Sequence, residues 1–401
     1  MVNQVMAGLG KKRSVIRELF EYAKIRAQEI GRENVFDFSL GNPSIPAPPS
    51  VNAALKEIID GTDPIALHGY SSAQGDLSVR KSVASSINRR FGRNTNESLI
   101  YMTCGAAASL RISFSALIEE GEELIAFAPC FPEYKVFAES AGAKFTLLAS
   151  ERETLQIDLA ALERAISART KIVLVNSPNN PSGVIYSEET VRGLCELLAR
   201  KEKEYSHPVY LVADEPYREL TYGKEVPYLM NYYDDTLVCY SWSKSLSLPG
   251  ERIGYIALCE RMAEKEDVYA AICGAGRSLG YVCAPVLFQK LVERCGEDTA
   301  DVGAYRKNRD LLLSGLRKAG YTCIEPDGAF YLFVKALEED ETAFCERAKE
   351  YELLLVPGGD FGSPGYVRIA YCVSYEQIEK SLPAFQKLAE AYQGASHEFH
   401  R

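Results

Sequence analysis

The sequence predicts an α/β protein whose large domain is a mostly parallel seven-stranded sheet covered by helices, plus a smaller α+β domain. Between residues 50 and 285, short apolar runs alternate with helical patterns, which is typical of βαβ units. After residue 285 the pattern changes to long helical segments with a few short strands. The strands expected in the large domain are 99–103, 123–127, 144–148, 171–176, 209–213, 237–241 and 253–258.

The first helix is expected at 14–30, because apolar residues recur there at helical spacing between Ser14 and Gly31. A loop rich in proline and glycine follows it. The long helical pattern from 286 to 320 marks the start of the smaller domain. The expected parts are an N-terminal helix and arm packing with the small domain (1–49), the large domain (50–285), the small C-terminal domain (286–393) and a disordered tail (394–401).

Composition and charge exclude several classes of protein. The net charge of -10 leaves no basic surface for nucleic acid, and no apolar run reaches the roughly 18 residues that a membrane span needs. The eleven cysteines include no C-x-x-C pair, so we interpret them as thiols of a cytoplasmic protein. The four histidines are not spaced as metal ligands, and we expect no metal site.

Lys244 lies in a loop of serine and glycine residues between two apolar strands. A lysine in such a place is poorly explained as a surface charge, and a lysine with a lowered pKa can form a Schiff base. Arg252 could hold a phosphate group bidentately, with help from the hydroxyls of Ser241 and Ser243. Together these residues indicate pyridoxal 5'-phosphate (PLP), bound as an imine to Lys244.

Asp214 ends an apolar strand, where a carboxylate is costly to bury unless it is paired. It could pair with a pyridinium nitrogen, or it could simply cap a helix. Tyr217, three residues on, could donate a hydrogen bond to the phenolic oxygen of the cofactor. Asn180 lies in a turn-forming segment at the carboxyl end of another strand, where its amide could reach the cofactor or serve only the turn.

Two further features have both a functional and a structural interpretation, and a buried arginine needs a partner. The small residues Gly105, Ala106 and Ala107 open a helix after a strand, and they could admit a phosphate or form a tight turn. Phe131 could stack on a flat ring or pack in the core. Arg368 lies inside an apolar strand and needs a partner, and a substrate carboxylate held bidentately would serve.

The order of these motifs along the chain resembles that of the class I and II aminotransferases, and the aspartate aminotransferases in particular. The resemblance covers nearly the whole chain. The motifs that carry it are Gly41-Asn42-Pro43, Tyr70 with Gly75, Gly105-Ala106-Ala107, Phe131, Asn180-Pro181-Ser182-Gly183, Asp214 with Tyr217, Ser241 with Lys244 and Arg252, and Arg368.

The resemblance implies the fold-type I architecture of PLP-dependent transferases and a site shared within a homodimer. Lys244, Asp214 and Tyr217 would be the catalytic residues, with Asn180 also on the ring oxygen. Arg368 would bind the substrate α-carboxylate, helped by Asn180 and the backbone at Gly41. The phosphate contacts implied are Ala106, Ala107, Ser241, Ser243, Arg252 and Tyr70 of the other subunit.

The substrate side chain is the part of the comparison that transfers least. Phe131 stands where relatives often have tyrosine or tryptophan. Residues 274–281, which we interpret as a loop, are rich in glycine where many relatives are polar. Arg277 lies near the place where dicarboxylate-specific relatives supply an arginine across the dimer, although it could equally be a surface arginine. The expected donor is therefore aspartate or glutamate, and the expected acceptor is 2-oxoglutarate.

Other functions are also compatible with parts of the sequence. A PLP-dependent C–S β-lyase of the cystathionine type shares most of these motifs, as do aminotransferases for alanine or aromatic amino acids. The Ser241-x-x-Lys244 spacing also occurs in penicillin-recognising enzymes, but their Ser-Asp-Asn and Lys-Thr-Gly motifs are missing. A PLP-fold transcription factor would carry an additional helix-turn-helix domain before Gly41, where the sequence predicts a single helix.

Overall fold

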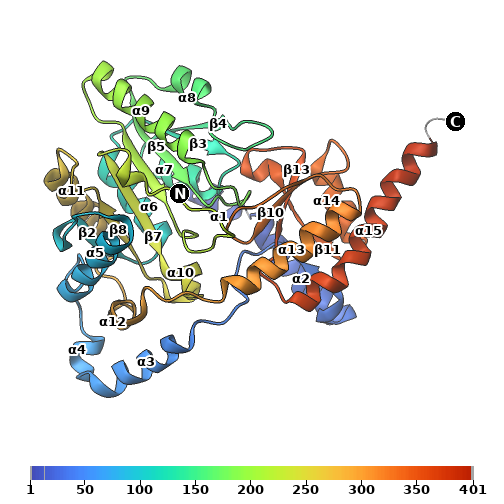
Figure 1. Cartoon of the computed structure of the whole chain (residues 1–401), viewed down its shortest axis with the longest axis horizontal. Helices are drawn as coiled ribbons and strands as arrows, with labels where there is room; N and C mark the ends of the chain where they lie inside the picture. The colour runs from blue at the N-terminus through green and yellow to red at the C-terminus, as the bar shows by residue number, and fades with distance from the viewer. Residues whose placement is uncertain (1, 13, 399–401) are drawn as a thin grey trace. The chain divides into compact units, whose positions relative to one another are not determined.

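The structure is a computed structural model that describes residues 2–12 and 14–398 (Figure 1). The chain divides into two compact units, and each is described by itself. We call Ile45–Val302 with Asp327–Ala329 the large unit. The small unit consists of Met1–Ser44, Gly303–Pro326 and Phe330–Arg401.

The large unit is built on a seven-stranded sheet in the order β2-β8-β7-β6-β5-β3-β4. The strands β3 to β7 pair in parallel, and β8 runs antiparallel to β2 and β7. All seven expected strands are present, so the predicted α/β fold class is confirmed. They are β2 (Ile100–Thr103), β3 (Glu123–Ala128), β4 (Lys144–Ala149), β5 (Thr170–Asn176), β6 (Tyr210–Asp214), β7 (Thr236–Ser241) and β8 (Gly254–Leu258).

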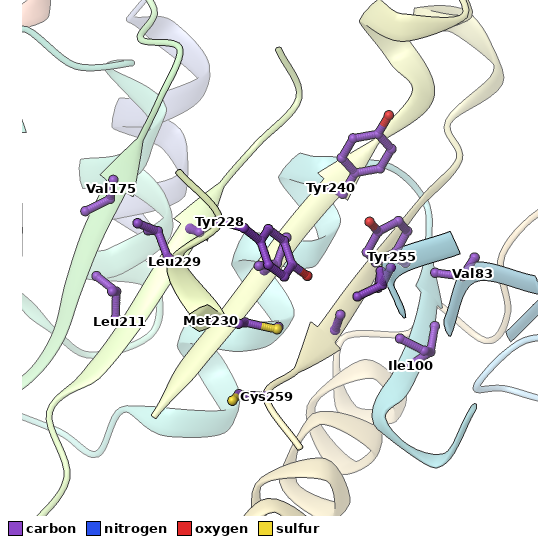
Figure 2. Close-up of a cluster of buried hydrophobic side chains, with 14 of the residues drawn as sticks. Val83, Ile100, Val175, Leu211, Tyr228, Leu229, Met230, Tyr240, Tyr255 and Cys259 are labelled. Atoms are coloured by element: carbon purple, nitrogen blue, oxygen red, sulfur yellow. The ribbon is translucent and has the colours of Figure 1, made fainter. Parts of the chain in front are cut away.

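The central strands are apolar throughout because both of their faces are buried, as is usual for parallel strands. Alternate residues belong to two separate cores. In β5, Val173 and Val175 face one core, whereas Ile172 and Leu174 face the other. Figure 2 shows part of the first core, where Tyr240 and Tyr255 extend from adjacent strands, with their rings stacked 5.0 Å apart.

Helices cover both faces of this sheet. Residues of α5, α9 and α12 pack in the first core, and residues of α6, α7 and α11 pack in the second. The helices of the large unit are α3 (Pro49–Gly61), α4 (Pro64–His68), α5 (Leu77–Phe91), α6 (Ala106–Leu117), α7 (Glu133–Ser140), α8 (Leu159–Ala165), α9 (Glu188–Tyr205), α10 (Trp242–Ser245), α11 (Lys265–Ser278) and α12 (Val286–Cys295), with 3-10 helices at Glu97–Leu99, Leu229–Asn231 and Pro249–Glu251.

Helix α9 shows how the local sequence sets these elements. The Ser187 side chain accepts a hydrogen bond from the backbone N–H of Thr190, so it caps the start of the helix. Two glutamates follow in the first turn, where negative charge is favourable. Val191, Leu194 and Leu198 then recur on one face and are buried against the sheet.

The small unit holds a four-stranded antiparallel sheet, β12-β13-β10-β9, and the parallel pair β1-β11. Phe38, Phe330, Phe333, Phe344 and Phe385 are among its fully buried side chains. Its elements are α1 (Gln4–Lys11), α2 (Val15–Ile30), β1 (Phe36–Asp37), α13 (Val302–Lys318), β9 (Cys323–Ile324), β10 (Tyr331–Lys335), α14 (Glu341–Lys349), β11 (Leu353–Leu354), β12 (Val356–Pro357), β13 (Tyr366–Ala370) and α15 (Tyr375–Glu398), with 3-10 helices at Arg32–Asn34 and Gly358–Phe361.

Two expectations about the ends of the domains differ from the structure. Helix α12 was expected to begin the small domain, but Leu291, Val292 and Cys295 are buried in the core of the large unit. A disordered tail was expected from residue 394, whereas residues 394–398 continue helix α15. A single glycine at 394 costs a helix only about 1 kcal/mol relative to alanine. Residues 399–401 lie outside the described part of the chain.

The glycine-rich segment 274–281, expected as a loop, is helical as far as Ser278. At position 276 a glycine is needed, because a Cβ atom there would lie 2.2 Å from the hydroxyl oxygen of Tyr101 on β2. The glycine lets α11 approach the sheet closely. Among the described residues, no helix is both long and apolar enough to cross a membrane.

Candidate active site

Polar residues of the large unit gather where the carboxyl ends of its strands meet. The pairing register aligns Asn176 of β5 with Asp214 of β6, and Asp214 with Cys239 of β7. Gly254 of β8 pairs with Ser241 on one side and with Thr103 on the other. The ends of five strands therefore lie along one edge of the sheet, where ligands bind in open α/β sheets.

Gly105 and the guanidinium group of Arg252 are in close contact at this edge. A Cβ atom on Gly105 would lie 2.7 Å from Nη2 of Arg252, and the glycine has a φ of +92°. It precedes α6, whose first residues, Ala106 and Ala107, are partly exposed. A helix N-terminus with free backbone N–H groups and an adjacent arginine is suited to bind a phosphate.

Ser241, Ser243 and Lys244 occupy the turn from β7 into the short helix α10. The Ser241 hydroxyl donates to that of Ser243 at 3.2 Å, and both serines are buried. Lys244 is only partly buried. The apolar strand β7 and the 3-10 helix before Arg252 hold this serine-containing turn at the same edge of the sheet.

Asp214 is buried at the end of β6, with 5% of its surface exposed. The Tyr134 hydroxyl donates to its Oδ2 atom at 2.5 Å, whereas Oδ1 has no hydrogen-bond partner among the described residues. Burial raises the pKa of the Asp214 carboxyl to about 7. The hydrogen bond from Tyr134 opposes this shift, and the charge of Glu215 adds to it.

Two of the expected site residues belong to the small unit. Arg368 is 2% exposed, donates a hydrogen bond to the Ser39 carbonyl, and lies over the ring of Tyr331 at 4.8 Å. A Cβ atom on Gly41 would overlap the hydroxyl of the same tyrosine. Within this unit, Arg368 and Gly41 therefore both lie next to the side chain of Tyr331.

The comparisons with known proteins agree on a single family. Residues 33–385 match the family model for aminotransferase class I and II. The chain belongs to this family. It is 30% identical to the aspartate aminotransferase of Thermotoga maritima, over 90% of this chain and 93% of that protein.

Solved structures of aminotransferases share this fold. An aminotransferase from Eubacterium rectale is 55% identical, with a TM-score of 0.96 and coverage of 98% of this chain and 99% of that one. The aspartate aminotransferase of Thermus thermophilus, solved with maleate, is 27% identical, with a TM-score of 0.85 and coverage of 97% and 100%. The chain is thus a PLP-dependent aminotransferase of fold-type I.

The loop after β5 holds the next two expected residues of this aminotransferase. The Asn176 side chain donates to the Asp214 carbonyl at 2.9 Å and accepts from the backbone N–H of Asn180 at 2.8 Å. Asn176 therefore connects Asn180 to the end of β6. Tyr217 is buried three residues beyond Asp214. The structure thus links Asn180 and Asp214 through hydrogen bonds to one side chain, that of Asn176.

Tyr70 and Arg277 are not packed with these residues in the single chain. Tyr70 is 90% exposed, and Arg277 is exposed in the last turn of α11.

Two supporting residues were missed by the sequence interpretation, namely Tyr134 and Asn176. Tyr134 lies in the segment that contains Phe131, and the two rings meet edge to face at 5.6 Å. Its partner Asp214 is 80 positions away in the sequence, so no local pattern links them. Asn176 ends β5 and pairs with Asp214 across the sheet. The signal available in the sequence was its place directly after an apolar run, which is also the place of Asp214.

We predict that Asp214 titrates near pH 7 in the protein without cofactor, because burial favours its protonated form. The folded-state pKa exceeds the unfolded one, so its contribution to stability is greatest at low pH and is lost as the pH rises toward 7. Infrared spectra should lose a protonated-carboxyl band between about pH 5 and about pH 9.

Asp235 also has a pKa raised to about 7, so the spectra of an Asp214→Asn variant must be subtracted to isolate Asp214. A band assigned to Asp214 that disappears near its ordinary pKa of about 4 would contradict the prediction.

Proposed function

We propose that this aminotransferase transfers the amino group of aspartate or glutamate to a 2-oxo acid such as 2-oxoglutarate. The reaction would follow a ping-pong course with PLP attached to Lys244. The single observation that carries the binding of PLP is the buried Asp214 carboxylate, because its Oδ1 atom has no partner among the described residues. A buried carboxylate needs a partner, and a protonated pyridine nitrogen would supply one.

The other expected residues fit the remaining groups of PLP. The phosphate would bind to the Arg252 guanidinium, which lies against Gly105, and to the start of α6. The hydroxyls of Ser241 and Ser243 would add further hydrogen bonds to it. Tyr217 and Asn180 would donate to the ring oxygen, and Phe131 would stack on one face of the ring. When bound, PLP supplies an electron-withdrawing ring that stabilises the negative charge formed at the substrate carbon.

The protein residues then bind the substrate and move protons. Arg368 would grip the α-carboxylate with two parallel hydrogen bonds, helped by Asn180 and the backbone at Gly41. The Lys244 amine would take the proton from the α-carbon and return it at the neighbouring position.

The eleven free cysteines also support a cytoplasmic location, where thiols stay reduced.

Lys244 should be the residue that is modified when the cofactor-loaded protein is treated with borohydride, because only a lysine imine is reduced to a stable bond. Mass spectrometry of peptides identifies the site, and a label on any other lysine would refute the proposal. Lys244→Ala should lower kcat by about 10²–10⁴-fold, since proton transfer by a positioned group contributes this much. Lys171→Ala is the control, because this lysine lies at the amino end of β5, away from the carboxyl ends of the strands.

A C–S β-lyase is the principal alternative. With cystathionine and no added 2-oxo acid, a lyase would release pyruvate continuously, whereas the proposed aminotransferase would stop after one amino group per site. Activity that depends on 2-oxoglutarate supports the proposal.

We propose that the protein is a homodimer in which Tyr70 contacts the phosphate bound in the partner subunit. The motivating observation is its 90% exposure. Tyr70→Ala and Lys244→Ala should each be inactive alone. Subunits mixed at random should recover about a quarter of the wild-type activity, because half of the dimers contain one complete site of two. An active monomer in sedimentation, or no recovery on mixing under conditions where subunits exchange, would refute it.

Arg277 is proposed to select the second carboxylate of the donor from across the dimer. An Arg277→Ala variant should then lose kcat/KM for aspartate by about 10²-fold or more, since a desolvated arginine–carboxylate pair is lost. Activity with alanine, leucine and tyrosine should change little. Arg294→Ala removes the same charge from the last turn of α12 and is the matched control. An equal loss for all four donors, or no loss, would show that Arg277 is not the selector.

A further inference from the structure

We propose that Tyr134 is a positioning residue that directs Oδ1 of Asp214 toward the cofactor nitrogen and keeps the shared proton on that nitrogen. This inference rests on the proposed function, because it requires the pairing of Asp214 with PLP. Tyr134 would act through Asp214 and would not touch the substrate.

The contact between the two residues is short and protected from water. The Tyr134 hydroxyl donates to Oδ2 of Asp214 at 2.5 Å, and the tyrosine is 1% exposed. Hydrogen bonds to a charged acceptor are about twice as strong as neutral ones. Since solvent does not compete here, this bond fixes the rotation of the carboxylate.

The bond also distinguishes the two carboxylate oxygens. Oδ2 is occupied by Tyr134, and Oδ1 is the buried oxygen without a partner among the described residues. The backbone of Asp214 is held separately, because its carbonyl accepts from Asn176 at 2.9 Å. The backbone and Oδ2 are thus both held by protein groups, and Oδ1 is the carboxylate oxygen available to accept a hydrogen bond from a ligand.

Tyr134 also connects Asp214 to the aromatic ring proposed to stack on the cofactor. It lies in the first turn of α7, where its ring meets Phe131 edge to face at 5.6 Å and 83°. The helix is anchored in the core of the large unit through Tyr134 and Ala138. One side chain therefore sets the spacing between the residue at the ring nitrogen and the residue at the ring face.

The location of the shared proton follows from the same bond. Asp214 and a pyridine nitrogen share one proton, and a donor to Oδ2 stabilises the carboxylate form, so the proton stays on the ring nitrogen. Tyr134 lowers the pKa of Asp214 in this way, against the effect of burial and of the Glu215 charge. The other titratable groups near the pair are Cys239, Tyr217 and Cys130.

The test is a Tyr134→Phe variant, which removes the hydroxyl and keeps the ring. With nitrogen-15-labelled PLP bound, the NMR signal of the ring nitrogen should move toward that of unprotonated pyridine. We expect kcat to fall about tenfold or more with little change in KM for the donor, because a hydrogen bond to a charged group is lost. In the protein without PLP, Asp214 should titrate at higher pH than in wild type.

Tyr233→Phe is the matched control, because the hydroxyl of this buried tyrosine lies 3.0 Å from the Val209 carbonyl and 3.2 Å from a Glu202 carboxylate oxygen, and it can donate its one proton to either. It should destabilise the protein without moving the nitrogen signal. An equal effect of both variants on the nitrogen signal, or no effect of Tyr134→Phe, would overturn the proposal.

An Asp214→Asn background provides a second, independent comparison. Removal of the Tyr134 hydroxyl should have little further effect on kcat there, whereas independent losses would multiply and overturn the proposal. If the wild-type protein takes up no PLP, or is labelled at a lysine other than Lys244, the proposed function itself fails. The titration of Asp214 in the cofactor-free Tyr134→Phe protein still reports on the Tyr134 contact in that case.

Discussion

The register of the parallel strands in the large unit is the constraint on which the candidate site depends. It places Asn176 and Asp214, the last residues of β5 and β6, side by side, and it pairs Asp214 with Cys239 of β7. Because the side chains of a strand alternate between its faces, a shift of one residue would turn Asp214 toward the opposite core. Both faces of the sheet are apolar and closely packed, so the strand ends are where polar groups can gather.

The buried charged residues of the two units differ in the contacts that stabilise them. In the small unit, the Arg368 guanidinium donates to the Ser39 carbonyl and lies between the rings of Tyr331 and Phe361, at 4.8 and 4.9 Å. In the large unit, Asp214 receives one strong bond from Tyr134, and burial still raises its pKa to about 7. Burial of an incompletely paired carboxylate is costly, and such perturbed groups are common at functional sites.

The sequence alone predicted the strands and the motifs at their ends, because apolar runs and turn residues are local signals. It did not predict where helix α12 packs, since helical periodicity identifies a buried face but not the surface that covers it. Gly276 was misread for a similar reason, because its closeness to Tyr101 depends on contact between α11 and β2. Tyr134 was missed because its partner lies 80 positions away.

Residues of the candidate site were predicted where the local sequence sets their position, and they were missed where packing between distant segments sets it. Lys244, Asp214 and Asn180 lie at strand ends, where the local sequence largely determines the backbone, so their motifs are readable without a structure. Tyr134, which contacts Asp214, comes from helix α7, whose position depends on packing across the whole unit. Tyr70 and Arg277 differ from both groups, because they are exposed in the single chain. The proposed selection of the donor side chain by Arg277 would thus depend on a surface that the sheet does not fix, and it could vary among chains that keep the same strand ends.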